Sequence, residues 1–132
     1  MLSDEYYNSV IILNNNIKND EFLTKHIPDL SIKNFINRII KYTLNNSSAE
    51  TEFKPWILQC SYNILSHVSH IINDNNIYNI IITSILISSK YILDQHYSNL
   101  YYSKIGGIEL YLLNKFEIKM LNIIKWNFFN FS

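Results

Sequence analysis

One predicted helix carries cysteine and histidine side chains, which are the first candidates for chemistry because together they could ligate a metal ion. Cys60, His67 and His70 fall on one side of a helix expected to begin near Pro55 and end near Ile72. At a rise of about 1.5 Å per residue, Cys60 and His70 lie roughly 15 Å apart along the axis, too far to share one zinc ion. The two histidines alone would need further ligands from elsewhere. We therefore expect packed or solvated side chains here and no metal site.

Other residues of types used in catalysis lack the flanking residues that catalytic motifs contain. The Gly106-Gly107 pair lacks the flanking residues of a phosphate-binding loop, so we interpret it as a turn or a close contact between helices. No Ser/His/Asp or Cys/His arrangement has supporting context either. These patterns therefore give no support for catalysis, although a triad that forms only in the folded chain stays open.

The composition narrows the class of partner. The 132 residues include 11 Lys+Arg and 11 Asp+Glu, so the formal charge is zero, and both halves of the chain are nearly balanced. A protein held to nucleic acid mainly through phosphate contacts is therefore not expected. With 48% hydrophobic residues, the chain has enough apolar surface for one buried core. The 24 Ile and 19 Asn have A+T-rich codons, and we interpret them first as nucleotide bias.

The location of the protein is expected to be intracellular, in the nucleus or the cytoplasm. Cys60 is the only cysteine, which excludes an internal disulfide and suits a reducing compartment. No signal peptide is visible, because the first apolar stretch, residues 10–13, is short and follows two acidic residues. The longest apolar segment, Ile77 to Leu93, is interrupted by polar residues and is too short for a membrane span. No membrane association is predicted.

The chain is divided by Asn-rich clusters that favour loops, at residues 14–16, 45–48 and 73–76. Between them the apolar residues recur with a helical period. The expected helices run from Glu5 to about Asn14, from a Ser31 cap onward, from Pro55 to about Ile72, from Ile77 to about Leu93, and from about Ile108 to Trp126, and a Tyr-rich stretch precedes Gly106. Residues 45–53 are expected to form a polar loop, and residues 20–30 a connecting segment.

Two of these helices have informative faces. After Ser31, apolar residues follow at i, i+3, i+4, i+7 and i+8, the spacing of one buried face: Ile32, Phe35, Ile36, Ile39 and Ile40. The segment Ile77–Leu93 is apolar nearly all round, which predicts the central helix of a bundle. Ser84 and Ser88, four residues apart, would let a neighbouring helix approach closely. The fold class is therefore predicted to be all-α, with six helices in one unit.

Three segments together resemble the cyclin box, specifically that of P/U-type cyclins of the phosphate-regulon kind. They are LSIKNFINRIIKYT (30–43), the segment NIYNIIITSILISSKYILDQHYSNLYYSKIGG (76–107) and LNKFEIKMLNIIKWNFF (113–129). The signature residues are Arg38, Tyr101, Tyr102, Lys104, Gly106 and Gly107. The resemblance implies a single cyclin box at residues 31–129, a five-helix bundle around a central buried helix. Residues 1–30 would form a preceding helix and lead-in, and residues 130–132 a short C-terminal end.

The resemblance also implies a function, that of a regulatory subunit which binds and activates a cyclin-dependent Ser/Thr kinase by docking on its C-helix. Such a subunit is expected not to be an enzyme itself and to need no cofactor and no small-molecule substrate. Lys90 and Glu117 match the cation and the carboxylate that contact the kinase. The apolar pocket of the family matches Tyr91, Leu121, Trp126 and Phe128. From spacing alone, Lys90 and Glu117 could instead be solvated surface charges, either separate or paired with each other.

Two departures from the family pattern matter. The acidic residue that usually pairs with the arginine at position 38 is missing, so Arg38 is expected to bind carbonyl groups or loop acids such as Glu50 or Glu52. Lys41 stands where substrate-recruiting cyclins have a leucine, so that docking function is not expected. The missing acid motivates an alternative, a cyclin-fold adaptor that binds a non-kinase partner. A cyclin fold associated with nucleic acid is disfavoured by the neutral charge.

Overall fold

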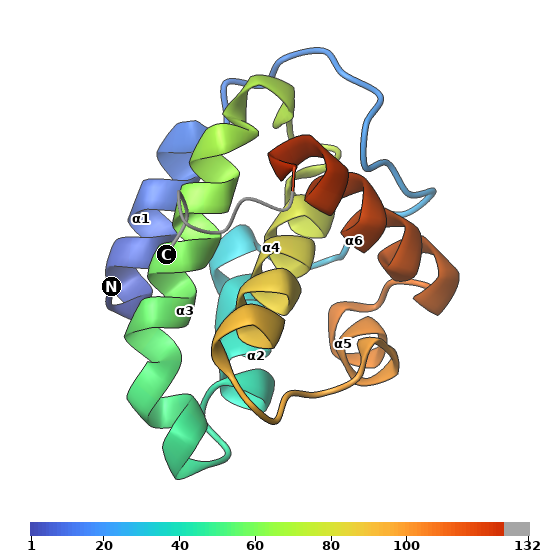
Figure 1. Cartoon of the computed structure of the whole chain (residues 1–132). Helices are drawn as coiled ribbons and strands as arrows, with labels where there is room; N and C mark the ends of the chain where they lie inside the picture. The colour runs from blue at the N-terminus through green and yellow to red at the C-terminus, as the bar shows by residue number, and fades with distance from the viewer. Residues whose placement is uncertain (126–132) are drawn as a thin grey trace.

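Residues 1–125, the part of the chain that the structure describes, form six α-helices and one short 3₁₀ turn in a computed structural model (Figure 1). The elements are α1 (Ser3–Leu13), α2 (Ile32–Thr43), α3 (Ser48–His67), η1 (Ser69–Ile71), α4 (Ile77–Ile92), α5 (Asn99–Gly106) and α6 (Leu110–Ile124). The described residues contain no strand. The prediction of an all-α fold is confirmed, and none of these helices is both long and apolar enough to cross a membrane.

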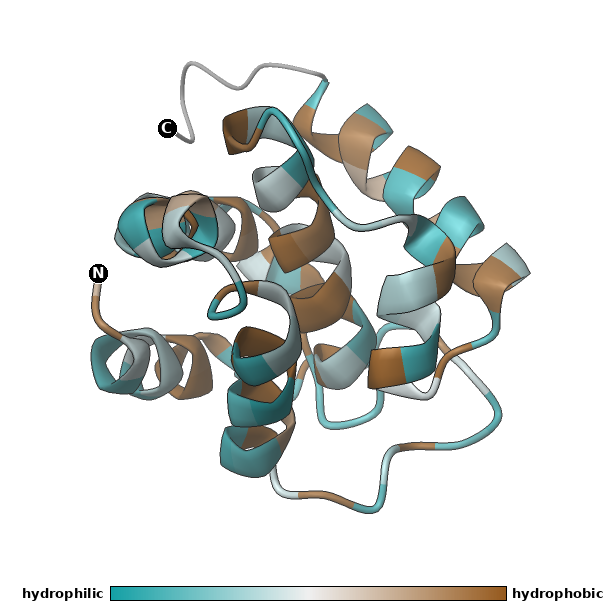
Figure 2. Ribbon diagram, turned by 90° about the horizontal axis from the view of Figure 1, so that it is seen from below, coloured by the Kyte–Doolittle hydropathy of each residue, from teal (hydrophilic) through white to brown (hydrophobic). Residues whose placement is uncertain are grey.

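Helix α4 occupies the centre of the bundle, as its apolar sequence predicts. From Ile77 to Ser89 every residue except Tyr78 is buried. Helices α2, α3, α5 and α6 all pack against it. In Figure 1 α4 runs through the middle of the molecule, and in Figure 2 the helices at the centre are largely hydrophobic in colour. Burial of side chains on all faces of one helix gives the fold a single core.

The start of α2 is the predicted one, whereas the start of α3 is not. Ser31 Oγ accepts a hydrogen bond from the Asn34 amide at 3.1 Å, and the predicted apolar face of α2 is buried apart from half-buried Ile32. The expected loop over residues 45–53 is wrong, because α3 begins at Ser48. Ser47 caps it by accepting from the Glu50 amide at 3.1 Å, and a cap of this kind stabilises a helix by about 1 kcal/mol.

Two further boundaries of α3 differ from the prediction. Pro55 lies inside the helix instead of in its first turn, although an interior proline removes one main-chain hydrogen bond. The long buried face of α3 outweighs that loss, since seven of its residues are buried. The helix ends at His67, and η1 replaces the predicted last turn.

A chain of buried hydroxyl groups joins α1, α3 and α4. Tyr6 Oη lies 2.7 Å from Ser61 Oγ, which lies 2.7 Å from Ser84 Oγ, and Ser84 donates to the carbonyl oxygen of Ile81 at 2.8 Å. Because Ser84 donates to Ile81, it accepts from Ser61, which in turn accepts from Tyr6. Every hydroxyl in the chain is therefore satisfied, as buried polar groups require. The predicted close approach at Ser84 is the contact between α3 and α4.

Two buried tyrosines make stability sensitive to alkaline pH. Burial raises the pKa of Tyr6 well above its ordinary value of 10.0, and burial raises the pKa of Tyr102 to about 12. Above pH 10 the unfolded chain loses these protons while the folded chain keeps them. The contribution of these two tyrosines to stability is therefore constant below about pH 10 and falls above it, by about 1.4 kcal/mol per pH unit for each tyrosine.

Urea denaturation at a series of pH values measures this dependence. We expect the midpoint to be flat near neutral pH and to fall steeply above about pH 10. Tyr102→Phe removes one titrating group and should make the fall shallower. An equal slope in the variant would show that Tyr102 does not contribute.

The segment that joins α1 to α2, residues 14–31, is held by three asparagines, and we call it the strap. Asn73 Nδ2 donates to the carbonyl oxygens of Ile17 and Asn19, both at 3.0 Å. Asn76 Nδ2 donates to Glu21 O at 3.1 Å, and Asn79 Nδ2 donates to Phe22 O at 2.8 Å. The three asparagines are three residues apart, and each binds carbonyl oxygens further along the strap than the one before. These asparagines bind main chain that has no regular secondary structure of its own.

Phe22 anchors the strap in the core. It is 1% exposed, and its ring centroid lies 5.3 Å from that of Phe116 on α6. Its φ of 59° is in the left-handed region, which costs a non-glycine residue about 1–2 kcal/mol. The burial of the ring and the hydrogen bond from Asn79 offset this strain. The strap therefore links α1 to α2 as a fixed part of the fold.

Candidate protein-binding site at Lys90 and Glu117

The structure brings the two predicted charges together. Lys90 lies in the last turn of α4, and Glu117 lies in the middle of α6. Lys90 Nζ is 2.8 Å from Glu117 Oε2, and the side chains are 31% and 15% exposed. The two helices pack against each other, so their contact fixes the pair. In the isolated chain the two charges therefore pair with each other, as one interpretation of their spacing predicts.

A third residue, Asn99, completes this site. Asn99 is the first residue of α5, and its Nδ2 donates to Glu117 Oε1 at 3.0 Å and to Asn114 Oδ1 at 2.7 Å. Its Oδ1 is buried and has no hydrogen-bond partner among the described residues. Sequence reasoning missed Asn99, because it belongs to no motif and lies 18 residues from Glu117. Three helices thus converge on one carboxylate.

The predicted apolar residues of the site have different surroundings. Tyr91, next to Lys90, is 44% exposed. Leu121, one turn after Glu117 on α6, is only 7% exposed and belongs to the core. Trp126 and Phe128 lie outside the described residues. Of the predicted pocket residues that the structure describes, Tyr91 therefore lies at the surface and Leu121 in the core.

The two tyrosines of the signature fix α5 against its neighbours. Tyr102 is buried and donates to Ser89 Oγ on α4 at 3.0 Å. Tyr101 donates to the carbonyl oxygen of Tyr42 on α2 at 2.8 Å, and its ring stacks on that of Tyr97 with centroids 4.2 Å apart. By holding α5, these contacts also hold Asn99 against Glu117.

The remaining signature residues have structural and surface positions. Arg38 Nε donates to the carbonyl oxygen of Ile105 at 2.9 Å, so the expected carbonyl partner is present and no acid is needed. Gly106 packs directly on Ile82, where an added Cβ would overlap Cδ1 of the isoleucine. Gly107 has a φ of 65°, which favours glycine, and it ends α5. Lys104 is exposed.

The two acids expected as alternative partners of Arg38 both lie on α3. Glu50 is 7% exposed, and its Oε1 accepts from the Asn46 amide at 2.9 Å. The Glu50 carboxylate also interacts with Tyr97. Burial is the largest cause that raises the pKa of Tyr97, the hydrogen bond with Asn46 lowers it, and Glu50 raises it further. Glu52 is exposed on α3.

The cysteine and histidines considered as metal ligands are separated. Cys60 is fully buried, and burial raises the pKa of its thiol. His67 and His70 are exposed. Within residues 1–125, no three His, Cys, Asp or Glu side chains come together in a group that could hold a metal ion.

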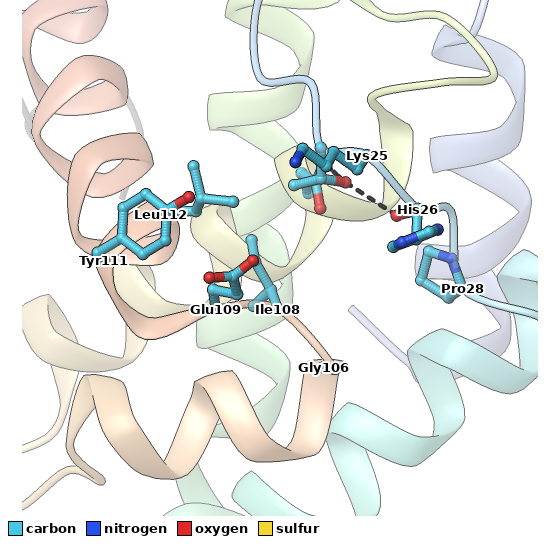
Figure 3. A pocket seen from close by; sticks show the side chains of 11 residues that line it. Lys25, His26, Pro28, Gly106, Ile108, Glu109, Tyr111 and Leu112 are labelled. Atoms are coloured by element: carbon cyan, nitrogen blue, oxygen red, sulfur yellow. Dashed lines mark hydrogen bonds between the residues drawn. The ribbon is translucent and has the colours of Figure 1, made fainter.

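A small cavity of about 190 Å³ lies beside Gly106 and Gly107. Figure 3 shows Lys25 and His26 of the strap on one side of it, across from Glu109 and Tyr111 at the start of α6. Thr24 Oγ1 donates to the carbonyl oxygen of His26 at 2.9 Å and stabilises that wall. The cavity has polar and apolar walls and is not lined by Lys90 or Glu117.

Comparison with known proteins identifies the family. The sequence profile of the Cyclin family matches residues 6–128. The chain is 34% identical over 105 residues to Cyclin-U2-2 of Arabidopsis thaliana, covering 79% of this chain and 44% of that protein. It is 29% identical over 108 residues to PHO85 cyclin-like protein psl1 of Schizosaccharomyces pombe, covering 82% and 44%. It is 28% identical over 109 residues to PHO85 cyclin-7 of Saccharomyces cerevisiae, covering 76% and 38%.

The chain therefore spans less than half the length of these curated relatives. The family match includes most of α1 as well as the five helices that follow it. The relatives carry the names of the P/U group that the signature residues resemble. With a family match over nearly all of its length, the chain belongs to the cyclin family.

Proposed function

We propose that this chain is the regulatory subunit of a protein kinase. It binds a cyclin-dependent Ser/Thr kinase and activates it by docking on the kinase C-helix, with Lys90 and Glu117 at the centre of the contact. Members of the cyclin family are non-catalytic subunits of this kind, and two of the relatives are named as PHO85 cyclins or as similar to them. The proposed place of action is the nucleus or the cytoplasm.

The observation that carries the proposal is the geometry of the Lys90–Glu117 pair. Both charges are partly exposed where α4, α5 and α6 meet, and Tyr91, which follows Lys90 in the sequence, is 44% exposed. Exposed tyrosines and charged groups that are held in fixed positions are typical of protein-binding hot spots. Asn99 Oδ1, a buried acceptor without a partner, adds a group that a docked donor would satisfy.

Activation in this proposal is a shift of a conformational equilibrium in the kinase. The cyclin stabilises the active position of the C-helix, which completes the Lys–Glu ion pair that positions ATP. To move the kinase from about 1% to about 99% active, the cyclin must bind the active state roughly 10⁴-fold more tightly, or by about 5.5 kcal/mol. Because the ion pair and the hydrogen bonds of Asn99 already position Lys90 and Glu117, little of the binding energy is lost in ordering these side chains.

Co-purification with candidate cyclin-dependent kinases tests the proposal. We expect a stable complex that phosphorylates a model Ser/Thr substrate, whereas the kinase alone is nearly inactive. If no candidate kinase binds, or if the complex forms without stimulation of phosphorylation, the proposed function is wrong. Failure to bind any candidate kinase would favour the alternative, a cyclin-fold adaptor that binds a non-kinase partner.

A further inference from the structure

The neighbouring helices α2 and α5 form a surface whose charge differs from that of the whole chain. α2 carries Lys33, Arg38 and Lys41, α5 carries Lys104, and neither helix contains an acidic residue. All four basic residues are exposed. The neutral balance along the sequence does not extend to this surface, which we call the basic face.

Two hydrogen bonds hold the two helices of the basic face in one unit. Arg38 Nε donates to Ile105 O on α5, and Tyr101 Oη donates to Tyr42 O on α2. Arg38 uses one of its five N–H donors in this bond. Lys104 directly precedes Ile105, so it lies beside the point where Arg38 meets α5.

The cations of the basic face gather around aromatic rings. Arg38 Cζ and Lys41 Nζ lie 5.6 and 5.4 Å from the centroid of the Tyr42 ring, which is 39% exposed. Lys33 Nζ lies 5.8 Å from the centroid of the Tyr7 ring on α1. Contacts of this kind are worth about 0.5–1 kcal/mol at exposed sites, and they leave the positive charge in place.

Among the described residues, no acid neutralises these cations through an ion pair. The ion pairs within residues 1–125 are Lys90–Glu117 and Lys119–Glu21, neither of which involves α2 or α5. The acids closest in sequence are Asp29, just before α2, and Glu109, at the start of α6. Glu109 lines the cavity that Lys25 and His26 face from the other side (Figure 3), so that edge of the basic face is not acidic overall.

We propose that the basic face docks an extended acidic segment of a partner protein. Lys33 and Lys41 are eight residues apart on a helix, which separates their positions by about 12 Å along the axis. A single phosphate or carboxylate cannot contact both ends of such a row. An extended chain rises about 3.3 Å per residue, so a segment of about four or more residues with several Asp or Glu side chains matches it. Complementary charge of this kind gives specificity and speeds association.

The proposal is independent of kinase binding, and its test uses the isolated chain. The probe is a fluorescein-labelled peptide of about eight alternating glutamate and serine residues, with a matched glutamine-serine peptide as the neutral control. Fluorescence anisotropy at about 0.1 M salt, where the Debye length is roughly 10 Å, should show binding of the acidic peptide alone. Binding should weaken as the salt concentration rises.

Matched variants place the binding on the basic face. The triple variant Lys33→Glu, Lys41→Glu and Lys104→Glu should weaken binding at least about tenfold, while Arg38 is retained because it holds Ile105. The control replaces exposed lysines elsewhere, Lys18→Glu, Lys115→Glu and Lys125→Glu, and changes the net charge equally. Circular dichroism and thermal melting check that each variant folds.

Two results would overturn the proposal. If the control variant weakens peptide binding as much as the triple variant does, net charge and not the basic face is responsible. If a single-stranded oligonucleotide of equal charge binds more tightly than the acidic peptide, the face would be a nucleic-acid surface. Amide shift changes confined to α2 and α5 on titration with the peptide would give independent support.

Discussion

Exchanging the charges of the ion pair, as Lys90→Glu with Glu117→Lys, should reduce kinase stimulation at least about tenfold while leaving the fold intact. The double variant retains an attractive pair between α4 and α6, so the isolated protein should stay stable. A docked kinase would meet each charge with the wrong sign, and like charges at a contact cost several kcal/mol. Phosphorylation of a model substrate and the dissociation constant of the complex measure the effect.

A second ion pair on the same helix provides the control. Lys119 on α6 pairs with Glu21 of the strap, and both side chains are partly exposed. Exchanging these charges, as Lys119→Glu with Glu21→Lys, should leave kinase stimulation unchanged within about twofold. If the Lys90–Glu117 exchange also leaves stimulation unchanged, the pair only joins α4 to α6, and the proposed contact is incorrect.

Replacement of Asn76 should give the largest loss of stability among the polar substitutions. Asn76 is fully buried, its Nδ2 donates to Glu21 O and Ile71 O, and its Oδ1 accepts from the Asn73 amide. Asn76→Ala leaves three main-chain groups without partners, and each unsatisfied buried group costs about 1–3 kcal/mol. Because some of these groups can reach water after relaxation, we expect a loss of about 3 kcal/mol in the free energy of unfolding, measured by urea denaturation.

Two further variants separate hydrogen bonding from general effects of the loop. Asn75→Ala alters the exposed neighbour and should change the free energy of unfolding by less than about 0.5 kcal/mol. Asn76→Asp retains the size of the side chain but turns a carboxylate oxygen toward carbonyl oxygens, so it should destabilise at least as much as Asn76→Ala. A neutral effect of Asn76→Asp would mean that the two N–H donors do not stabilise the strap.

The sequence predicts the parts of this fold that depend on apolar periodicity. The central position of α4 follows from its continuous apolar surface, and the start of α2 follows from Ser31 and the spacing after it. The start of α3 could not be predicted in the same way, because Ser47 and Pro55 are both typical of helix starts. The hydrogen bonds made by the side chains of Ser47 and Glu50 at the start of α3 decide between them, and the burial of Glu50 depends on residues distant in sequence.

The long-range hydrogen bonds of the asparagines could not be predicted from the sequence either. The prediction of a loop at Asn73 and Asn76 is correct. Their hydrogen bonds to the strap could not be predicted, because they join residues more than 50 positions apart. Asn99 is comparable, since its link to Glu117 arises only when α5 packs on α6. The resemblance to a family points to Lys90 and Glu117, but the distance of 2.8 Å between Lys90 Nζ and Glu117 Oε2 depends on the packing of α4 on α6.

The contact between Gly106 and Ile82 constrains how the sequence can change over time. Because a Cβ at position 106 would occupy the space of Ile82 Cδ1, alanine there fits only if the buried Ile82 side chain turns that methyl group away or if residue 82 loses it, as in valine. Ile82→Val alone leaves a small cavity, at a cost of about 0.5–1.5 kcal/mol, and alanine at position 106 would fill it. Among relatives we therefore expect the two positions to covary, with the smaller residue at 82 appearing before the larger one at 106. Gly107 has no such route, because its constraint comes from its own backbone angle.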